Sequence, residues 1–509
     1  MLSNLKSKQP RESFYPRMTK LKSCMNQARQ KLMGFGLRQL EHLSTRPTTG
    51  NMYLSGMYAP VPETTQWQFE IQGKIPTGLN GLLLRSGPNP LNMPQPDLHH
   101  WFMGDGMLHG LKLQQGQVKW FKSKYIQTDT IQKSYRQPLK PGFRRGPSDL
   151  VNTNAFVHAN KIWAMIEAGT YPARLDFDLN TEYHGLFNSD ADLPYTAHPH
   201  RDPATGHIHA ICYDAMDLFN VYYEVFDELG RLLHVCKIPL RDGVMIHDCA
   251  ITERDILIFD FPVTFSAKRL AKGYAFPYAW NENHPARIGV LPLYGQADQI
   301  QWIQVDPCFV FHAANAYRDE HDQIVVDMVV HDHMFKYSAQ GPLEQQQVCL
   351  ERWTILPETA SLKRELLDAA AQEFPRIDER VTGRQHRYIY SSGFEPQDPT
   401  AANVLIIHDL QQCQKTDISL GDDWLVGEAV FVEEKEQGTP DTPCDFETST
   451  VEGQGYLLAY AHHRQGQASK VCIFQVHGLE YQLQAEIMLR SRVPLGFHTS
   501  WIPLKPADG

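Results

Sequence analysis

Short β-type runs follow one another along most of this chain, and no helical period alternates with them. From about residue 65 onward, runs rich in β-branched and aromatic residues are broken by turns such as DELG, HANK and EGQG. Representative runs are QVKWFKSKYIQT, KIWAMIEAG, DILIFDF, QIVVDMVV and KVCIFQVHG. A doubly wound α/β fold needs helices between its strands, and a sandwich or single barrel holds too few strands. The pattern favours an all-β fold, and a β-propeller gathers many four-stranded units around one axis.

The number of units stays open at this level. A chain of 509 residues can hold two or three ordinary domains or one large β domain. No clear WD or kelch repeat is present from which blades could be counted. Nine scattered cysteines without a C-x-x-C pair fit reduced thiols better than a disulfide framework. Since the chain also lacks a signal-peptide core and any stretch of membrane-spanning length, we expect a cytoplasmic protein.

Residues 1–60 differ in composition from the rest and are expected to form a basic N-terminal arm. The first 50 residues carry ten Lys and Arg against two Glu, although the whole chain has a net charge of −10. The stretch MNQARQKLMGFGLRQLEHL spaces its apolar residues as an amphipathic helix does. Such an arm can contact anionic lipid, pack against the main body or remain solvated. We expect peripheral membrane contact and no nucleic-acid partner.

A second segment that is both aromatic and basic spans residues 262–285, PVTFSAKRLAKGYAFPYAWNENHP. This composition is typical of a segment that contacts a membrane interface, with Phe276 and Trp280 as candidate anchors. The alternative is a short helix that covers one face of the propeller.

Four histidines are candidates for a metal centre. They are separated by about 50, 65 and 185 residues, so none has the His-x-x-x-His spacing of a helical zinc site. The four are His198 in TAHPHRDP, His247 in VMIHDCAIT, His312 in FVFHAANAY and His498 in PLGFHTSW. If they converge, four neutral imidazoles suit a redox-active transition metal and leave two octahedral positions open.

Each candidate also has a simpler interpretation. A lone histidine in a strand is usually a hydrogen-bonded core residue, and spacing does not choose between His198 and His200 within the sequence HPH. Cys249 could be read as a ligand, but a small buried apolar residue is the more common role.

Three glutamates lie in apolar surroundings, where a charge is costly unless it is partnered. They are Glu167 in AMIEAG, Glu373 in QEFPRID and Glu428 in LVGEAVFV. Metal-bound imidazoles usually donate their second N–H to a carboxylate. Alone, each glutamate is more often exposed or ion-paired, but three of them beside four histidines favour an outer ring of carboxylates around a metal.

Several long motifs occur in the order found in one family. They are LLLRSGPNP, WFMGDGMLHG, VNTNAFVH, TAHPHRDP, MIHDCAITERDILIFDFP, ARIGVLPLYG, FHAANAY, EFPRID and GFHTSW. Over roughly residues 65–505 the chain resembles the carotenoid cleavage oxygenases, which include apocarotenoid oxygenases, stilbene-cleaving dioxygenases and the retinoid isomerohydrolase. The resemblance implies that residues 61–509 form a single dioxygenase domain, a seven-bladed β-propeller with a loop-and-helix cap over the active-site face.

The resemblance also implies one axial Fe(II) per chain and assigns its surroundings. It selects His198 rather than His200, with His247, His312 and His498 as the other ligands. It pairs Glu167 with His247, Glu373 with His312 and Glu428 with His498. Thr153 matches the threonine whose methyl group crowds an open metal position.

By the same resemblance, O2 and a lipophilic polyene or stilbene meet in an apolar tunnel, and cleavage of a C=C bond gives two carbonyl products. Candidate lining residues are Trp101, Phe102, Tyr135, Ile166, Phe311 and Trp501. Tyr135, in SYRQP, matches a tyrosine of the stilbene-cleaving relatives, but Ile166 stands where those relatives carry a lysine that activates the phenol. This departure favours a carotenoid or apocarotenoid. Stilbene cleavage, retinyl ester isomerohydrolysis and non-catalytic lipid binding remain alternatives.

Overall fold

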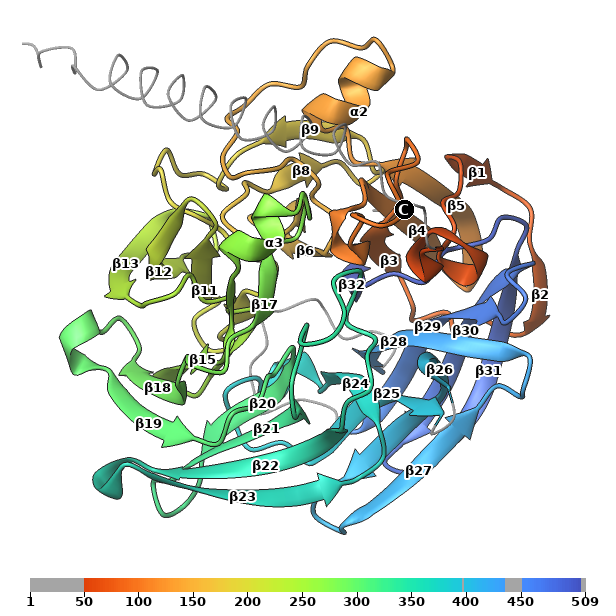
Figure 1. Ribbon diagram of the computed structural model, residues 1–509. Helices are drawn as coiled ribbons and strands as arrows, with labels where there is room; N and C mark the ends of the chain where they lie inside the picture. Colours follow the sequence, from red (N-terminus) through yellow and green to blue (C-terminus); the bar gives the residue numbers. More distant parts are fainter. Residues whose placement is uncertain (1–49, 396–397, 435–450, 505–509) are drawn as a thin grey trace, which may run out of the picture.

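The computed structural model describes residues 50–395, 398–434 and 451–504, and nearly all regular structure within them is β. Seven sheets of four or five strands surround a central axis (Figure 1). This arrangement confirms the expected all-β, seven-bladed propeller. The amphipathic helix expected near the N-terminus falls in residues 1–49, which lie outside the described residues.

The first four sheets in chain order are antiparallel. The first contains β1 (Thr64–Gln66), β3 (Gly81–Pro88), β4 (Gly106–Gln114), β5 (Gln117–Tyr125) and the C-terminal β32 (Thr499–Pro503). The second contains β6 (Asn154–His158), β7 (Lys161–Met165), β8 (Ala173–Leu175) and β9 (Thr181–His184). The third contains β10 (His200–Arg201), β11 (Ile208–Asp214), β12 (Asp217–Phe226) and β13 (Leu232–Pro239). The fourth contains β14 (Cys249–Ile251), β15 (Asp255–Asp260), β18 (Ala286–Pro292) and β19 (Gln301–Val305).

The remaining three sheets follow the same antiparallel plan. The fifth contains β20 (Ala313–Arg318), β21 (Ile324–His331), β22 (Val348–Leu356) and β23 (Ser361–Asp368). The sixth contains β24 (Gln372–Arg376), β25 (Tyr388–Glu395), β26 (Asp398–Asp409) and β27 (Gln414–Ser419). The seventh contains β28 (Trp424–Glu433), β29 (Gln454–His463), β30 (Ser469–His477), β31 (Glu480–Leu489) and the early β2 (Glu70–Gly73).

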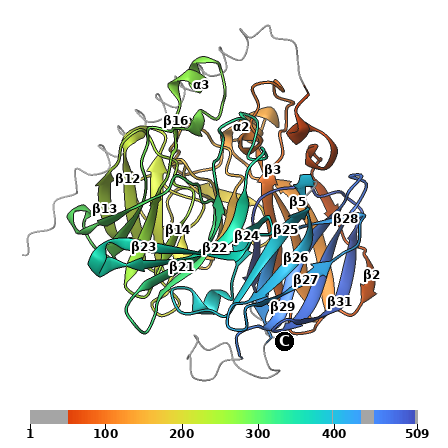
Figure 2. The ribbon, with the colours of Figure 1, turned by 60° about the horizontal axis from the view of Figure 1, so that its bottom comes forward.

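Strands from both ends of the chain close the ring. β32 pairs antiparallel with β3, with Arg85 opposite Thr499, and β2 pairs with β31, with Ile71 opposite Ile487. Figure 2 shows the early β2 and β3 beside the late β28 and β31. The first and seventh blades therefore each contain strands that lie more than 400 residues apart in the sequence.

Each blade places one strand nearest the axis: β32, β6, β10, β14, β20, β24 and β28 (Figure 1). The next strand out in each blade packs against neighbouring blades on both faces, so it loses the alternation of a half-exposed sheet, whereas the outermost β13 keeps that alternation. All eight residues of β21 are buried, for example. Asp327 within β21 is compensated by two hydrogen bonds of 2.8 Å from Arg352.

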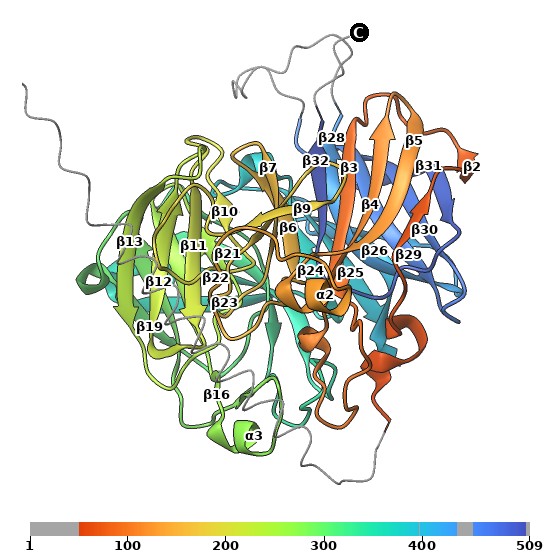
Figure 3. The same ribbon diagram turned by 90° about the horizontal axis from the view of Figure 1, so that it is seen from above.

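Loops and short helices cover one face of the ring, and α3 (Ala267–Ala271) projects from it (Figures 2 and 3). α3 lies between β16 (Val263–Phe265) and β17 (Tyr278–Trp280), which form a separate two-stranded sheet. Over the described ranges, the other helices are α2 (Asp129–Ser134) and the 3₁₀ turns Met52–Leu54, Gly56–Tyr58, Trp101–Met103, Ala297–Gln299, Pro357–Thr359 and Glu379–Val381.

Within the 262–285 segment, the candidate anchor Phe276 lies in the interior and Trp280 is half-buried. Phe276 is buried and stacks on His100 with ring centroids 4.0 Å apart. Arg269 donates to the carbonyls of Phe335 and Ser338 at 2.6 and 2.8 Å, so this cation holds the segment against a neighbouring loop. Phe265, Phe276 and Tyr278 of this segment line the interior cavity, which fits the alternative role of a covering element.

Residues 50–60, expected to belong to the arm, pack on the propeller instead. Tyr53 and Tyr58 are buried and contact the Trp101 ring, with centroids 5.3 and 5.2 Å from it. None of the helices in the described part of the chain is long and apolar enough to cross a bilayer.

Candidate metal centre

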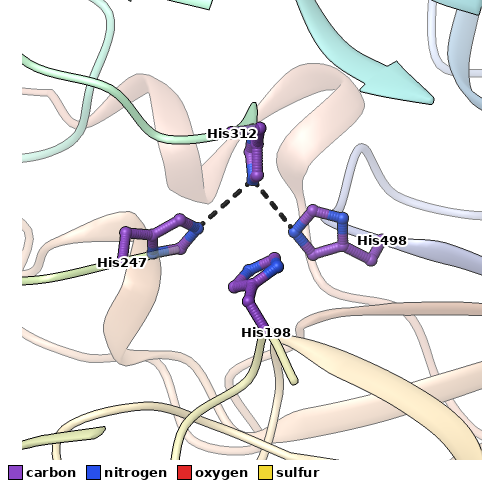
Figure 4. A group of neighbouring side chains, drawn as sticks. All are labelled: His198, His247, His312 and His498. Atoms are coloured by element: carbon purple, nitrogen blue, oxygen red, sulfur yellow. Dashed lines mark hydrogen bonds between the residues drawn. The ribbon is translucent and has the colours of Figure 1, made fainter. Parts of the chain in front are cut away.

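The four candidate histidines converge, with their rings gathered around a common centre (Figure 4). Each lies one or two residues before the innermost strand of a different blade. His198 precedes β10, His247 precedes β14, His312 precedes β20 and His498 precedes β32. Their candidate ligand nitrogens all lie within 4.8 Å of one another. A propeller brings such distant residues together because every inner strand starts at the same end of the axis.

Three of the histidines are oriented by the three glutamates, in the pairing that the resemblance implies. Glu167 Oε2 accepts from His247 Nδ1 at 2.7 Å, and Glu373 Oε2 accepts from His312 Nδ1 at 2.7 Å. Glu428 Oε1 accepts from His498 Nδ1 at 3.1 Å. A carboxylate only accepts, so in each neutral ring the proton lies on Nδ1 and Nε2 carries a lone pair.

This donor set fits a cation. His312 Nε2 lies 3.3 Å from His247 Nε2 and 3.2 Å from His498 Nε2, the contacts drawn as dashed lines in Figure 4. Lone pairs that face one another repel unless a positive charge lies between them. His198 Nε2 is buried and has no hydrogen-bond partner, as expected for a nitrogen that ligates a metal. Four imidazoles without a carboxylate ligand suit a transition metal rather than Ca²⁺ or Mg²⁺.

The electrostatics point the same way. Burial lowers the pKa of His498 to about 4, so its ring is neutral near pH 7. Burial also lowers the pKa of His312, but the Glu373 carboxylate outweighs burial and the net shift is upward. Positive charge beside His312 is therefore favoured, and a metal ion can supply it in place of a proton.

Each glutamate has further partners, and sequence reasoning missed them. Glu373 Oε1 accepts from His331 Nε2 at 2.7 Å, and Glu428 Oε1 accepts from Arg376 Nη1 at 3.1 Å. Burial alone raises the pKa of Glu428, but His498 and Arg376 outweigh it and bring that pKa to about 2. The available signals were a histidine ending the apolar run IVVDMVVH and an arginine three residues after Glu373.

Glu167 has a tyrosine as its neighbour rather than a cation. The pKa of Tyr213 lies well above its usual range, because of its burial first and the negative charge of Glu167 second. Tyr213 and Tyr278 line the same cavity as Glu167. Tyr213 reads as an ordinary strand aromatic in the sequence, and Tyr278 stood out only as part of the aromatic 262–285 segment.

A cavity of about 470 Å³ adjoins the histidines, and its wall is predominantly apolar and aromatic. Thr153, Ile166, Trp101, Phe102 and Phe311 line it, as expected. Other aromatic residues in the wall are Phe265, Phe276, Phe374, Phe394 and Phe497. Such a wall can bury a long apolar ligand and exclude water from it.

Thr153 lies next to the metal cluster. Its carbonyl accepts from the His498 backbone N–H at 3.4 Å, and its hydroxyl donates to Asn152 Oδ1 at 3.1 Å. The hydrogen bond to Asn152 fixes the orientation of the Thr153 side chain, and with it the position of the methyl group.

Two expected lining residues lie elsewhere. Tyr135 is 37% exposed at the end of α2, and its ring contacts Tyr125 rather than the cavity. Trp501 on β32 packs over Gly81 and the core between the first and seventh blades. Neither is among the described residues that line the cavity. Tyr135 is displaced because it caps a surface helix, and Trp501 because alternate residues of a strand face opposite sides.

His200 and Cys249 do not join the four-histidine cluster. His200 Nε2 bonds to Asp248 Oδ1 at 2.7 Å, and Cys249 is a buried free thiol. The choice of His198 over His200 agrees with this geometry.

Comparisons with known proteins agree with the fold and identify the family. Residues 58–503 match the family model described as retinal pigment epithelial membrane protein. A carotenoid cleavage oxygenase of Mycobacterium tuberculosis is 32% identical and covers 89% of this chain and 98% of its own length. Carotenoid 9,10(9',10')-cleavage dioxygenase 1 of Phaseolus vulgaris is 28% identical, with coverages of 88% and 89%. The crystal structure of Pseudomonas brassicacearum lignostilbene dioxygenase has a TM-score of 0.77 and 25% identity, covering 90% of this chain and 100% of that one.

Proposed function

Because the chain belongs to the retinal pigment epithelial membrane protein family, whose members include carotenoid cleavage oxygenases, we propose that it is an Fe(II)- and O2-dependent dioxygenase. Its proposed substrate is a carotenoid or apocarotenoid. One C=C bond breaks, each of its carbons takes one oxygen atom of O2, and two carbonyl products leave. The observation that carries this proposal is the cluster of four converging histidines at the wall of a large aromatic cavity.

The protein's own residues have three tasks in this reaction. His198, His247, His312 and His498 would hold the iron, which supplies the binding and activation of O2. Glu167, Glu373 and Glu428 orient three of those rings and would offset the positive charge of the metal. The aromatic wall would align the polyene so that its double bond lies near the metal, and it would exclude water from the site. The reaction needs no pair of acid and base side chains.

The preference for a polyene rests on one side chain. Ile166 lines the cavity beside Glu167 and is 8% exposed. An isoleucine offers no charge to a phenolate but adds apolar surface, and burial of a polyene contributes about 25 cal/mol per Å².

Stilbene cleavage is the second candidate, because the similar structure from Pseudomonas brassicacearum is a lignostilbene dioxygenase. Tyr135, the residue that favoured a stilbene in the sequence, does not reach the cavity.

The test is product analysis by mass spectrometry. The iron-loaded protein is incubated under ¹⁸O2 with a panel of carotenoids, apocarotenals and hydroxystilbenes. We expect ¹⁸O-labelled aldehydes from a polyene and little product from the stilbenes. Faster stilbene cleavage would make the second candidate the better one. Turnover of a retinyl ester without O2 would point to an isomerohydrolase.

A further inference from the structure

We propose that Asp248 and His200 act together as positioning residues that hold His198 in the metal centre, in place of the glutamate that this histidine lacks. The inference rests on the proposed function, since it requires a metal bound by the four histidines. In the described part of the chain, no carboxylate contacts the His198 ring, whereas each of the other three rings has its own glutamate.

Asp248 is buried and joins three neighbouring blades with one carboxylate. Its Oδ1 accepts from His200 Nε2 at 2.7 Å, and its Oδ2 accepts from the Ala313 backbone N–H at 3.0 Å. Asp248 directly follows His247, and Ala313 directly follows His312. One carboxylate thus fixes the starts of β10, β14 and β20, the strands that follow three of the ligands.

The link from His200 to His198 is short and stiff. Only Pro199 separates them, and its ring fixes its own φ. A residue before proline is also restricted to extended conformations, so the backbone of His198 has little freedom once His200 is anchored. The Cys249 thiol adds a weak contact, with Sγ 4.0 Å from the His198 carbonyl oxygen.

The same residues could instead be read as a second metal site, because potential ligand atoms of His200, Asp248 and Cys249 lie close together. The hydrogen bonds argue against that reading. Asp248 Oδ1 already accepts from His200 and from the Cys249 N–H at 2.7 Å, and Oδ2 accepts from Ala313. Three N–H donors thus engage both oxygens of this carboxylate, which suits a structural tie.

The experiment measures cobalt(II) affinity of the metal-free, full-length protein by its visible absorption spectrum. We expect Asp248→Asn to weaken cobalt binding by about 10–100-fold, the usual cost of removing an orienting partner. Its cobalt spectrum should also change, because His198 loses its fixed direction. The matched control is Asp260→Asn, since Asp260 is also buried in the fourth blade and bonds His284 Nε2 at 2.8 Å. That control should lower stability and leave cobalt affinity within about twofold of wild type.

A second pair of variants keeps the test independent of folding at position 248. His200→Phe removes the donor and should weaken cobalt binding, whereas His200→Gln places an N–H near the position of Nε2 and should restore most of it. If cobalt affinity is unchanged in Asp248→Asn and His200→Phe while wild type binds normally, the positioning role is wrong. If the wild-type protein binds no cobalt, or if His312→Ala binds cobalt as tightly as wild type does, the proposed metal centre is wrong, and this inference is wrong with it.

Discussion

Arg376 on β24 contacts Glu428 on the neighbouring β28, with Arg376 Nη1 3.1 Å from Glu428 Oε1. The same oxygen accepts from His498, so one carboxylate joins a guanidinium to a candidate ligand. Glu373 makes the equivalent link to an imidazole, His331. The two carboxylates hold their histidines alike but differ in what their removal would leave behind.

Glu428→Gln should therefore destabilise the metal-free protein more than Glu373→Gln does. Removing the charge leaves Arg376 with Glu379 as its one ionic partner among the described residues, and we expect a loss of about 3 kcal/mol, the low end for breaking a buried pair. Urea unfolding of the metal-free variants measures this. Adding Arg376→Met to Glu428→Gln should recover part of the loss. Equal unfolding free energies for the two Gln variants would contradict the expectation.

Alanine at any one of the four candidate ligands should deplete the metal. We expect about one iron per wild-type chain and a small fraction of that in His198→Ala, His247→Ala, His312→Ala and His498→Ala. His200→Ala should still reach one metal per chain at saturating metal, because its imidazole bonds to Asp248 and not to the cluster. Elemental analysis gives the answer. Normal iron in His198→Ala would show that the wrong histidine of HPH was chosen.

Ile166→Lys should slow polyene cleavage. The side chain lies in the cavity wall, and an ammonium group there must be desolvated. We expect kcat/KM for a polyene to fall at least about tenfold, which is a loss of about 1.4 kcal/mol of transition-state stabilisation. Ile166→Leu is the control and should retain activity. We also expect weak activity of the lysine variant on hydroxystilbenes. Tyr135 should not contribute to that activity, because it does not line the cavity. A lysine variant as fast as wild type on the polyene would remove Ile166 from the specificity argument.

Phe276→Ala should act on the cavity and not on a membrane contact. Its ring is buried among His100, Phe102 and Phe335, so truncation should cost about 3–5 kcal/mol and alter turnover. Sedimentation with anionic liposomes should match wild type. Replacing the exposed Lys268 and Lys272 of the same segment provides the comparison. Reduced liposome binding by Phe276→Ala alone would restore the anchor interpretation.

Acid should destabilise the protein partly through His462. Burial lowers the pKa of this histidine from 6.5 to about 3, while its Nδ1 donates to the Val493 carbonyl at 2.9 Å. The unfolded chain therefore takes up a proton below pH 6.5 that the folded chain refuses, and stability falls as pH falls toward 3.

His462→Asn keeps a donor near Nδ1 and cannot be protonated. Its unfolding free energy should depend less on pH, by up to about 1.4 kcal/mol per pH unit. Urea unfolding of the metal-free protein between pH 6 and pH 4 measures the slope. The exposed His477→Asn is the control and should keep the wild-type slope. Parallel slopes for His462→Asn and wild type would contradict the expectation.

The sequence predicted those features of the protein that depend on short, contiguous stretches of residues. Hairpin rhythm indicated a propeller, and apolar surroundings marked the glutamates, but the number of blades and the choice of His198 came from family resemblance. The contacts that were missed depend on register and packing between blades. Nothing in the run IVVDMVVH says that His331 meets Glu373, which lies 42 residues away in another blade. The prediction that Tyr135 and Trp501 line the cavity was wrong for the same reason. The sequence does not tell which side of a strand or helix an aromatic residue occupies.

The position of β32 has a consequence for how the protein matures. His498 is the last of the four histidines to be synthesised, 186 residues after His312, and it directly precedes the strand that completes the first blade. A nascent chain that has not yet reached His498 contains three of the four imidazoles and lacks β32. The complete four-histidine site can therefore form only after residue 498 has been synthesised and β32 has paired with β3 at the other end of the chain.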